Sequence, residues 1–232
     1  MFCKTLAISL DQMSTLSSDK PWYGYDRSFL AYAREFLIHP SALNGRRFEN
    51  EITGKDSLSW LDSGCGYGNA FFGAEMFNPG KHDYTGISMH FFPETIKIKN
   101  ELGERFQFFL GKSQEVIPSL SKQDLITDVF GAYLYTSGFE QRYSLLQQYY
   151  QLLSDDGIGF IRLPDYFNYK SRWRLEARLA TAYPEIFEIH LDFEPQLIIH
   201  KREQLLSAEL PLSQFEIEAE LDAKLLEMGD EF

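Results

Sequence analysis

Residues 60–70, WLDSGCGYGNA, place a short apolar run and an acid in front of three glycines at alternate positions, Gly64, Gly66 and Gly68. Residues 57–61 are predicted to form a buried strand, and residues 68–77 are predicted to form the helix that follows it. The glycines then lie in a strand-to-helix turn, where missing Cβ atoms permit positive φ and let a ligand lie against the backbone. The chain is therefore predicted to fold as an α/β protein with a small-molecule site at this turn.

The residues around the glycines indicate which ligand the turn takes. A dinucleotide fingerprint reads G-x-G-x-x-G and seats a pyrophosphate at the helix N-terminus. Here the spacing is G-x-G-x-G, and Asp62 stands two residues before the first glycine. This acid would repel a diphosphate but attract the ammonium and sulfonium charges of S-adenosylmethionine. The segment L-D-S-G-C-G-Y-G resembles motif I of the class I S-adenosylmethionine-dependent methyltransferases; the alternative is a tight glycine turn without a ligand.

The resemblance implies S-adenosylmethionine as cofactor and a set of residues that bind it. They belong to the glycine turn, to the ends of the second and third predicted strands, and to an aromatic segment near the N-terminus. The implied cofactor-binding residues are Asp62, Gly64, Cys65, Gly66, Gly68, Ser88, Met89, Ser113, Gln114 and Tyr25.

Two positions depart from the family pattern. Ser88 stands where the second strand usually ends in an acid that binds both ribose hydroxyls. After the third strand, Gly111 is followed by Lys112, where an Asp often contacts the adenine amine. A buried polar group that loses its partner costs on the order of 1–3 kcal/mol. We therefore expect weaker hydrogen bonding to adenosine at both positions.

Successive βα units predict the rest of the fold. After the first strand, further strands are expected at residues 83–87, 105–110, 124–130, 158–163, 187–192 and 197–200, with helices at 28–38, 93–102 and 139–153. The last two strands form an antiparallel hairpin, as in the methyltransferase fold. We predict an α/β, doubly wound, mostly parallel seven-stranded sheet with an antiparallel terminal hairpin strand and helices on both faces.

Candidate catalytic residues lie near the carboxyl end of the fourth strand and just after it. Methyl transfer from a sulfonium is an in-line displacement, which needs approach geometry and an acceptor for the nucleophile's proton. Asp128 is the first candidate base and Tyr133 the second residue of interest, with His90 as a further possibility. Asp128 has an alternative role as the cap of a backbone turn at residues 130–132, and Tyr133 an alternative role in ordinary packing.

Metal use is not expected. Asp165 and Asn168 follow the fifth strand near Asp128, but their spacing differs from that of the magnesium-dependent methyltransferases. The five histidines show no metal-ligand spacing. A basic run at Lys170, Arg172, Arg174 and Arg178 is either a solvated helix face or part of a wall for an anionic substrate.

The chain is predicted to have three parts. Residues 1–24 form an N-terminal segment that could close over the cofactor, with Trp22 and Tyr23 next to Tyr25, or simply cap the sheet edge. Residues 25–202 form the methyltransferase-like domain. Residues 203–232 carry nine acids and one base and show an apolar stripe at helical spacing, which predicts an acidic amphipathic helix that docks on the domain or joins two subunits in a homodimer.

The net charge and the composition of the sequence limit which classes of partner and which location we expect for the protein. A formal net charge of −12 argues against nucleic acid as a partner, and no segment is long enough to cross a membrane. Two cysteines, Cys3 and Cys65, favour a reducing compartment, so a cytoplasmic location is expected. The leading hypothesis is a methyltransferase that acts on a small molecule. The alternatives are a non-catalytic module with the same fold and, less favoured by the glycine spacing, a nicotinamide-dependent oxidoreductase.

Overall fold

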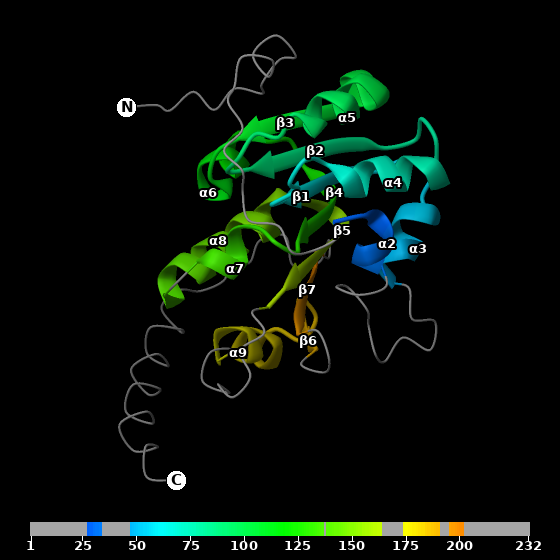
Figure 1. Ribbon diagram of the computed structural model, residues 1–232. Helices are drawn as coiled ribbons and strands as arrows, with labels where there is room; N and C mark the ends of the chain where they lie inside the picture. The colour runs from blue at the N-terminus through cyan, green and yellow to red at the C-terminus, as the bar shows by residue number, and fades with distance from the viewer. Residues whose placement is uncertain (1–26, 34–46, 137, 164–173, 191–194, 202–232) are drawn as a thin grey trace. The chain divides into compact units, whose positions relative to one another are not determined.

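The computed structural model describes residues 27–33, 47–136, 138–163, 174–190 and 195–201, and the account below concerns these residues (Figure 1). They form one seven-stranded sheet with the order β3-β2-β1-β4-β5-β7-β6. The strands are β1 Ser59–Ser63, β2 Asp83–Ser88, β3 Phe106–Leu110, β4 Gln123–Asp128, β5 Leu153–Arg162, β6 Phe187–His190 and β7 Gln196–His200. Strands β1 to β5 pair in parallel, and β7 is antiparallel to both of its neighbours.

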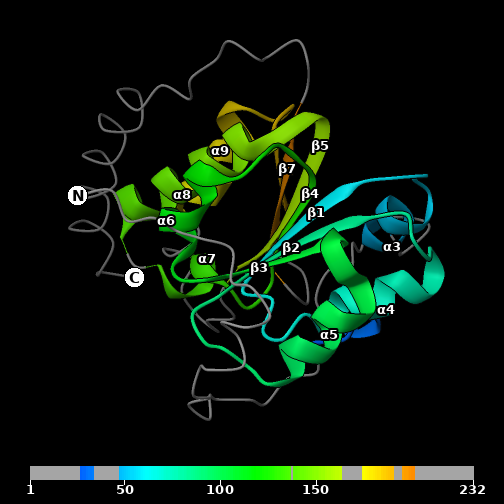
Figure 2. The same ribbon diagram turned by 90° about the horizontal axis from the view of Figure 1, so that it is seen from above.

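Helices cover both faces of the sheet (Figure 2). One face carries α2 Phe29–Ala31, α3 Arg47–Thr53, α4 Asn69–Phe77 and α5 Glu94–Leu102. The other carries α6 Ser113–Val116, α7 Ala132–Tyr135, α8 Phe139–Leu152 and α9 Arg174–Ala182. Short 3₁₀ helices at Gly103–Arg105 and Ile117–Ser119 complete the connections. The predicted doubly wound sheet with an antiparallel hairpin strand is confirmed.

The predicted element boundaries need small corrections. Strand β1 lies two residues later than expected, so Asp62 is inside the strand and not just after it. Strand β5 begins at Leu153, before the predicted Asp-Asp-Gly turn, and Asp156 adopts a positive φ of 62° within it. Only the first part of the predicted helix 28–38 lies within the described residues.

Aromatic side chains fill the space between the sheet and the helices α3 and α4. The Trp60 ring is fully buried and meets Phe71 edge-on at 4.7 Å between ring centroids and Phe48 at 5.5 Å. Phe71 in turn packs on Tyr84 and Phe106 at 5.2 and 5.6 Å. Such tilted and edge-on pairs add to the stabilisation from burial. This core holds β1 to β3 against α4, and so sets the position of the glycine turn that joins β1 to α4.

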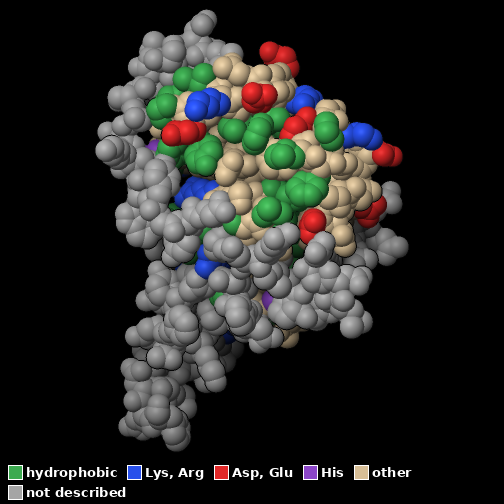
Figure 3. Space-filling model, turned by 45° about the vertical axis from the view of Figure 1, so that its right-hand side comes forward, with side chains coloured by type: hydrophobic (Ala, Val, Ile, Leu, Met, Phe, Trp, Pro, Cys, Tyr) green, Lys and Arg blue, Asp and Glu red, His purple; other side chains and the backbone are tan. Residues whose placement is uncertain are grey.

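The face that carries α4 shows hydrophobic side chains beside acidic and basic ones (Figure 3). No helix among the described residues is long and apolar enough to cross a membrane. Internal contacts divide the chain into units 1–202 and 203–232. The predicted segments 1–24 and 203–232 lie outside the described residues, so their helix, lid and dimer roles stay predictions.

Candidate functional site

The glycine turn has the backbone conformation that its sequence predicts. Gly64, Gly66 and Gly68 adopt φ values of 96°, 59° and 92°, a region that side-chain-bearing residues rarely occupy. The backbone N–H groups of Gly64 and Cys65 both donate to the carbonyl oxygen of Ile87, at 2.8 and 3.1 Å. The turn is therefore held against the end of β2.

The missing Cβ atoms serve packing within the chain more than contact with a ligand. A Cβ on Gly64 would lie 2.3 Å from the Cα of Gly131, and one on Gly66 would lie 3.0 Å from Arg27. A Cβ on Gly68 would meet Phe106, Ile98 and Phe71 in the core. Of the three glycines, Gly64 lines the cavity described next. Cys65 is also buried, with its sulfur against Gly86.

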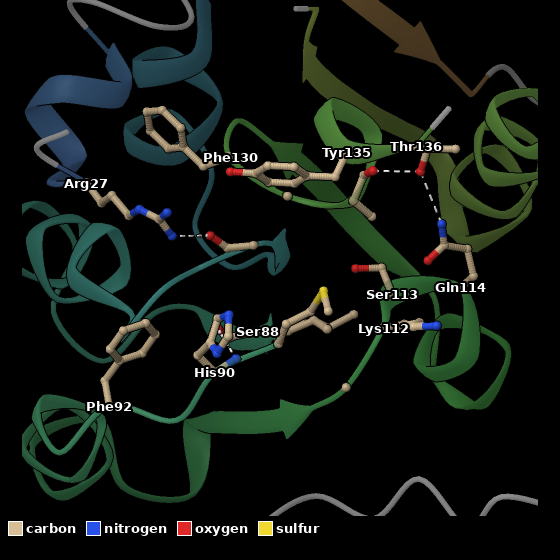
Figure 4. A pocket seen from close by; sticks show the side chains of 16 residues that line it. Arg27, Ser88, His90, Phe92, Lys112, Ser113, Gln114, Phe130, Tyr135 and Thr136 are labelled. Atoms are coloured by element: carbon tan, nitrogen blue, oxygen red, sulfur yellow. Dashed lines mark hydrogen bonds between the residues drawn. The ribbon is translucent and has the colours of Figure 1, made fainter. Parts of the chain in front are cut away.

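A cavity of about 710 Å³ opens at the carboxyl edge of the sheet, beside the glycine turn (Figure 4). Its walls come from the segments that follow β1, β2, β3 and β4, together with Arg27 in front of α2. The lining residues are Arg27, Gly64, Ile87, Ser88, Met89, His90, Phe92, Gly111, Lys112, Ser113, Gln114, Phe130, Gly131, Ala132, Tyr135 and Thr136. Ligands of open α/β sheets bind at this edge, and the volume suits a small molecule.

Five of the predicted cofactor contacts line this cavity: Gly64, Ser88, Met89, Ser113 and Gln114. The Ser88 hydroxyl accepts a hydrogen bond from the backbone N–H of His90 at 3.2 Å. The Gln114 amide donates to the Thr136 hydroxyl at 3.2 Å, which joins the wall after β3 to the wall after β4. The structure therefore brings residues from the ends of β2, β3 and β4 to one cavity.

Arg27 was not anticipated as a site residue. Its Nη1 atom donates to the carbonyl oxygen of Gly64 at 2.8 Å, and its guanidinium carbon lies 5.0 Å from the centre of the Phe130 ring. Arg162 lies over the same ring at 5.6 Å. Figure 4 shows Arg27 and Phe130 on the same side of the cavity. Neither residue belongs to a recognisable local motif, so the sequence carried no signal for this pair.

Asp62 lies beneath the site and does not line it. Its side chain is fully buried, and it accepts hydrogen bonds from the Tyr32 hydroxyl at 2.9 Å and the Thr127 hydroxyl at 2.8 Å. Burial raises the pKa of Asp62 to about 7, although these two hydrogen bonds and Arg27 oppose the shift. Both carboxylate oxygens are thus engaged inside the protein, and the expected attraction of a ligand cation by Asp62 has no direct contact to support it.

The two candidate catalytic residues, Asp128 and Tyr133, are also fully buried and outside the cavity lining. The Asp128 carboxylate accepts from the backbone N–H of Gly131 at 3.0 Å and of Tyr133 at 2.9 Å, which is the turn-capping alternative. The Tyr133 hydroxyl donates to the buried carboxylate of Glu176. The geometry does not bring either side chain to a ligand in the cavity, because both are committed within the fold.

Other candidates lie elsewhere or outside the described residues. His90 and Tyr135 line the cavity and are exposed. Tyr25, Trp22, Tyr23, Asp165, Asn168, Lys170 and Arg172 fall outside the described residues. Within the described part of the chain, no group of three His, Cys, Asp or Glu side chains is arranged to hold a metal ion.

Comparison with known proteins does not assign the chain to a family. No protein-family model matches the sequence, and no curated protein matches it. Among solved structures, the chain is similar to a putative S-adenosyl-L-methionine-dependent methyltransferase from Methanococcus maripaludis, with 14% identity, a TM-score of 0.48, and coverage of 83% of this chain and 100% of that one.

Two further solved structures show likeness of the same degree. A putative rRNA methylase from Clostridium thermocellum has 15% identity and a TM-score of 0.49, over 68% of this chain and 94% of that one. The 1,6-didemethyltoxoflavin-N1-methyltransferase of Burkholderia thailandensis has 17% identity and a TM-score of 0.49, over 66% and 75%. The strand order itself, with β7 antiparallel between β5 and β6, gives the chain the Rossmann-like fold of the class I S-adenosylmethionine-dependent methyltransferases.

Proposed function

We propose that the protein binds S-adenosylmethionine in the cavity at the carboxyl edge of the sheet and transfers its methyl group to a small molecule. The observation that carries the proposal is the convergence of the turn at Gly64 with the hydroxyls of Ser88 and Ser113, from the ends of three adjacent strands, on one cavity. This is where parallel α/β sheets present ligand-binding groups.

The lining residues fit the chemical groups of the cofactor in several respects. The Ser88 hydroxyl offers one hydrogen bond to a ribose hydroxyl, and the guanidinium of Arg27 offers a charge-assisted bond to a carboxylate. The apolar faces of Ile87 and Phe92 suit the adenine ring. One aspect fits less well, since the described lining contains the cations Arg27 and Lys112 but no carboxylate to attract a sulfonium.

The chemistry requires the residues of the cavity to orient two reactants. The cofactor, when bound, supplies an electrophilic methyl group. His90 carries an imidazole in the described cavity wall, and a ring nitrogen of this side chain can accept a proton from a nucleophile, in place of the buried Asp128. The cations Arg27 and Lys112 favour a substrate that carries negative charge. A cytoplasmic location and a homodimer through residues 203–232 remain parts of this proposal.

The test is calorimetric titration of the protein with S-adenosylmethionine and S-adenosylhomocysteine. We expect both to bind, and Ala132→Trp to abolish binding, because Ala132 lines the cavity with a half-exposed side chain and an indole there would fill the space. Leu134→Trp is the matched control, because Leu134 is on the same helix α7 but not in the lining. It should bind like the wild type.

A parallel titration with NADH separates this proposal from the oxidoreductase alternative. Tight binding of NADH together with no binding of S-adenosylhomocysteine would contradict the proposal. Unchanged binding by Ala132→Trp would also count against it, because the cavity would then not be the binding site.

A non-catalytic module is the second candidate, and one observation favours it. Asp128 at the end of β4 and Tyr133 after it, the two candidate catalytic residues predicted from the sequence, are buried and hydrogen-bonded within the fold. Incubation with methyl-labelled cofactor and a metabolite extract tests this alternative. Transfer of label by the wild type, and its reduction in His90→Gln with cofactor affinity unchanged, supports the enzyme.

A further inference from the structure

A chain of buried hydrogen bonds leads from the cavity wall to Asp128. The Ser113 hydroxyl lines the cavity and lies 2.7 Å from the Ser63 hydroxyl. The Ser63 hydroxyl lies 2.8 Å from the Tyr149 hydroxyl, which in turn lies 2.5 Å from Oδ2 of Asp128. Ser63, Tyr149 and Asp128 are fully buried, and Ser113 is 5% exposed. Ser113 is therefore the end of this hydrogen-bond chain that faces the cavity (Figure 4).

Counting protons determines the direction of every bond in this chain. An ionised carboxylate only accepts, and each hydroxyl has a single proton to donate. The Tyr149 hydroxyl lies within hydrogen-bond distance of both Ser63 and Asp128, and its single proton goes to the carboxylate, which can only accept. Ser63 also forms a hydrogen bond that stabilises the ionised Asp128, so Ser63 is the donor in that bond and its proton is used. Ser113 must then donate to Ser63, which leaves only lone pairs on the cavity side of the Ser113 oxygen.

We propose that Asp128, acting through Tyr149 and Ser63, fixes the Ser113 hydroxyl as a hydrogen-bond acceptor, so that this part of the cavity selects a ligand group that donates, such as an amine or a hydroxyl. Asp128 is thus a positioning residue that acts on the ligand through three hydroxyls. The choice of S-adenosylhomocysteine as the test ligand rests on the proposed function, whereas the existence of this chain of hydrogen bonds does not. The side chain of Lys112 has no hydrogen-bond acceptor, and its neighbour Ser113 supplies an acceptor on the same turn after β3.

Protonation of Asp128 would reverse the direction of the hydrogen bonds along this chain of hydroxyls. Burial raises the pKa of Asp128 to about 6, while the hydrogen bonds from Tyr149, from two backbone N–H groups and from Ser63 oppose the shift. Below this pH Asp128 donates to Tyr149, each hydroxyl turns, and Ser113 becomes a donor. The other ionisable groups of the described residues that face this region are Asp62 on β1, Tyr133 on α7, Glu176 on α9 and Arg142 on α8.

The first test measures the affinity for S-adenosylhomocysteine at pH 7.5 and pH 5.5. We expect Ser113→Ala to weaken binding about 3- to 10-fold at pH 7.5, the effect of one hydrogen bond. At pH 5.5 the wild type should lose this advantage over Ser113→Ala, because its serine then presents a proton. The titration of Asp62 is common to both proteins and cancels in the ratio. Ser119→Ala, outside the cavity lining, is the control and should match the wild type.

The second test needs no ligand and follows the Asp128 carboxyl by carbon NMR of aspartate-labelled protein. Tyr149→Phe removes a donor from the ionised carboxylate and should raise the pKa of Asp128, whereas Tyr150→Phe on the same helix should not. The inference would be overturned if Ser113→Ala and the wild type bound with equal affinity at pH 7.5, or if the ratio of their affinities did not change with pH. It would also be overturned if the pKa of Asp128 were the same in Tyr149→Phe as in the wild type. Failure of the wild type to bind S-adenosylhomocysteine contradicts the proposed function instead. The NMR titration then decides whether the chain of hydrogen bonds to Asp128 exists.

Discussion

At the residue scale, Ser88 determines how many hydrogen bonds the end of β2 can offer to a ligand. Its side chain is 7% exposed, lines the cavity, and accepts from the backbone N–H of His90. A hydroxyl in this position has one proton and a remaining lone pair. A carboxylate has two oxygens and would serve the same backbone N–H while it accepts from a ligand.

We predict that Ser88→Asp tightens the binding of S-adenosylhomocysteine by roughly tenfold, because charge-assisted hydrogen bonds are about twice as strong as neutral ones. Calorimetry at pH 7.5 measures the change, with Ser88→Asn as the uncharged control of similar size. Weaker binding by Ser88→Asp than by Ser88→Asn would show that the ribose does not lie against the end of β2.

At the scale of elements, the loops after β1 and β4 lie against each other with almost no space between their backbones. A Cβ on Gly131 would lie 1.7 Å from the carbonyl oxygen of Ser63 and 2.7 Å from Oδ1 of Asp128. Asp128 holds the second loop in place by accepting from the N–H of Gly131. This close contact brings Gly64 and Gly131 together at one wall of the cavity.

We therefore predict that Gly131→Ala destabilises the protein by about 1–3 kcal/mol or more, the range for overpacking, because the obstructing atoms are backbone and cannot turn aside. Gly159→Ala in β5 is the matched control. Its Cβ would meet Ile199 at an ordinary contact distance of 3.5 Å, so its effect should be much smaller. Urea unfolding monitored by tryptophan fluorescence measures both. Equal stability of the two variants would contradict the packing argument.

At the scale of the whole molecule, two buried carboxyl groups couple folding to pH. Burial raises the pKa of Asp62 to about 7 and that of Asp128 to about 6, above the values of an unfolded chain. The folded state thus binds protons more tightly than the unfolded state between about pH 4 and pH 7. The contribution of these groups to stability is present below pH 4 and is lost as the pH rises through 6 and 7.

We predict that Asp62→Asn gains stability relative to the wild type as the pH rises from 5 to 8.5, since the amide stays uncharged. Each unit of pKa shift corresponds to about 1.4 kcal/mol. Asp124→Asn is the control that should show no change with pH: hydrogen bonds from Ser154 and Ser59 outweigh burial and lower the pKa of Asp124, so this carboxyl is ionised in the folded and the unfolded state throughout this range. Urea unfolding at both pH values gives the comparison. A difference between wild type and Asp62→Asn that does not change with pH would contradict the prediction.

The local sequence was sufficient to predict the elements and their order. Apolar runs, the three glycines and the turn residues depend on neighbours a few positions away, so strands β1 to β7 could be located to within a few residues. The alternating glycines also predicted positive φ values, which Gly64, Gly66 and Gly68 adopt. The cofactor contacts of Ser88, Met89, Ser113 and Gln114 stay predictions, although the structure places all four at one cavity.

The orientation and partners of the polar side chains depend on tertiary structure. Asp62 and Asp128 both stand at the carboxyl ends of central strands, where sequence indicates a ligand. Their partners come from distant positions, Tyr32 and Thr127 for Asp62 and Tyr149 for Asp128, and these partners turn the carboxylates inward. The sequence by itself therefore determined which strands and turns form and where they converge, because these follow from short-range spacing. Which side chains face the cavity and which are buried beneath it was decided only by the packing of elements far apart in the chain.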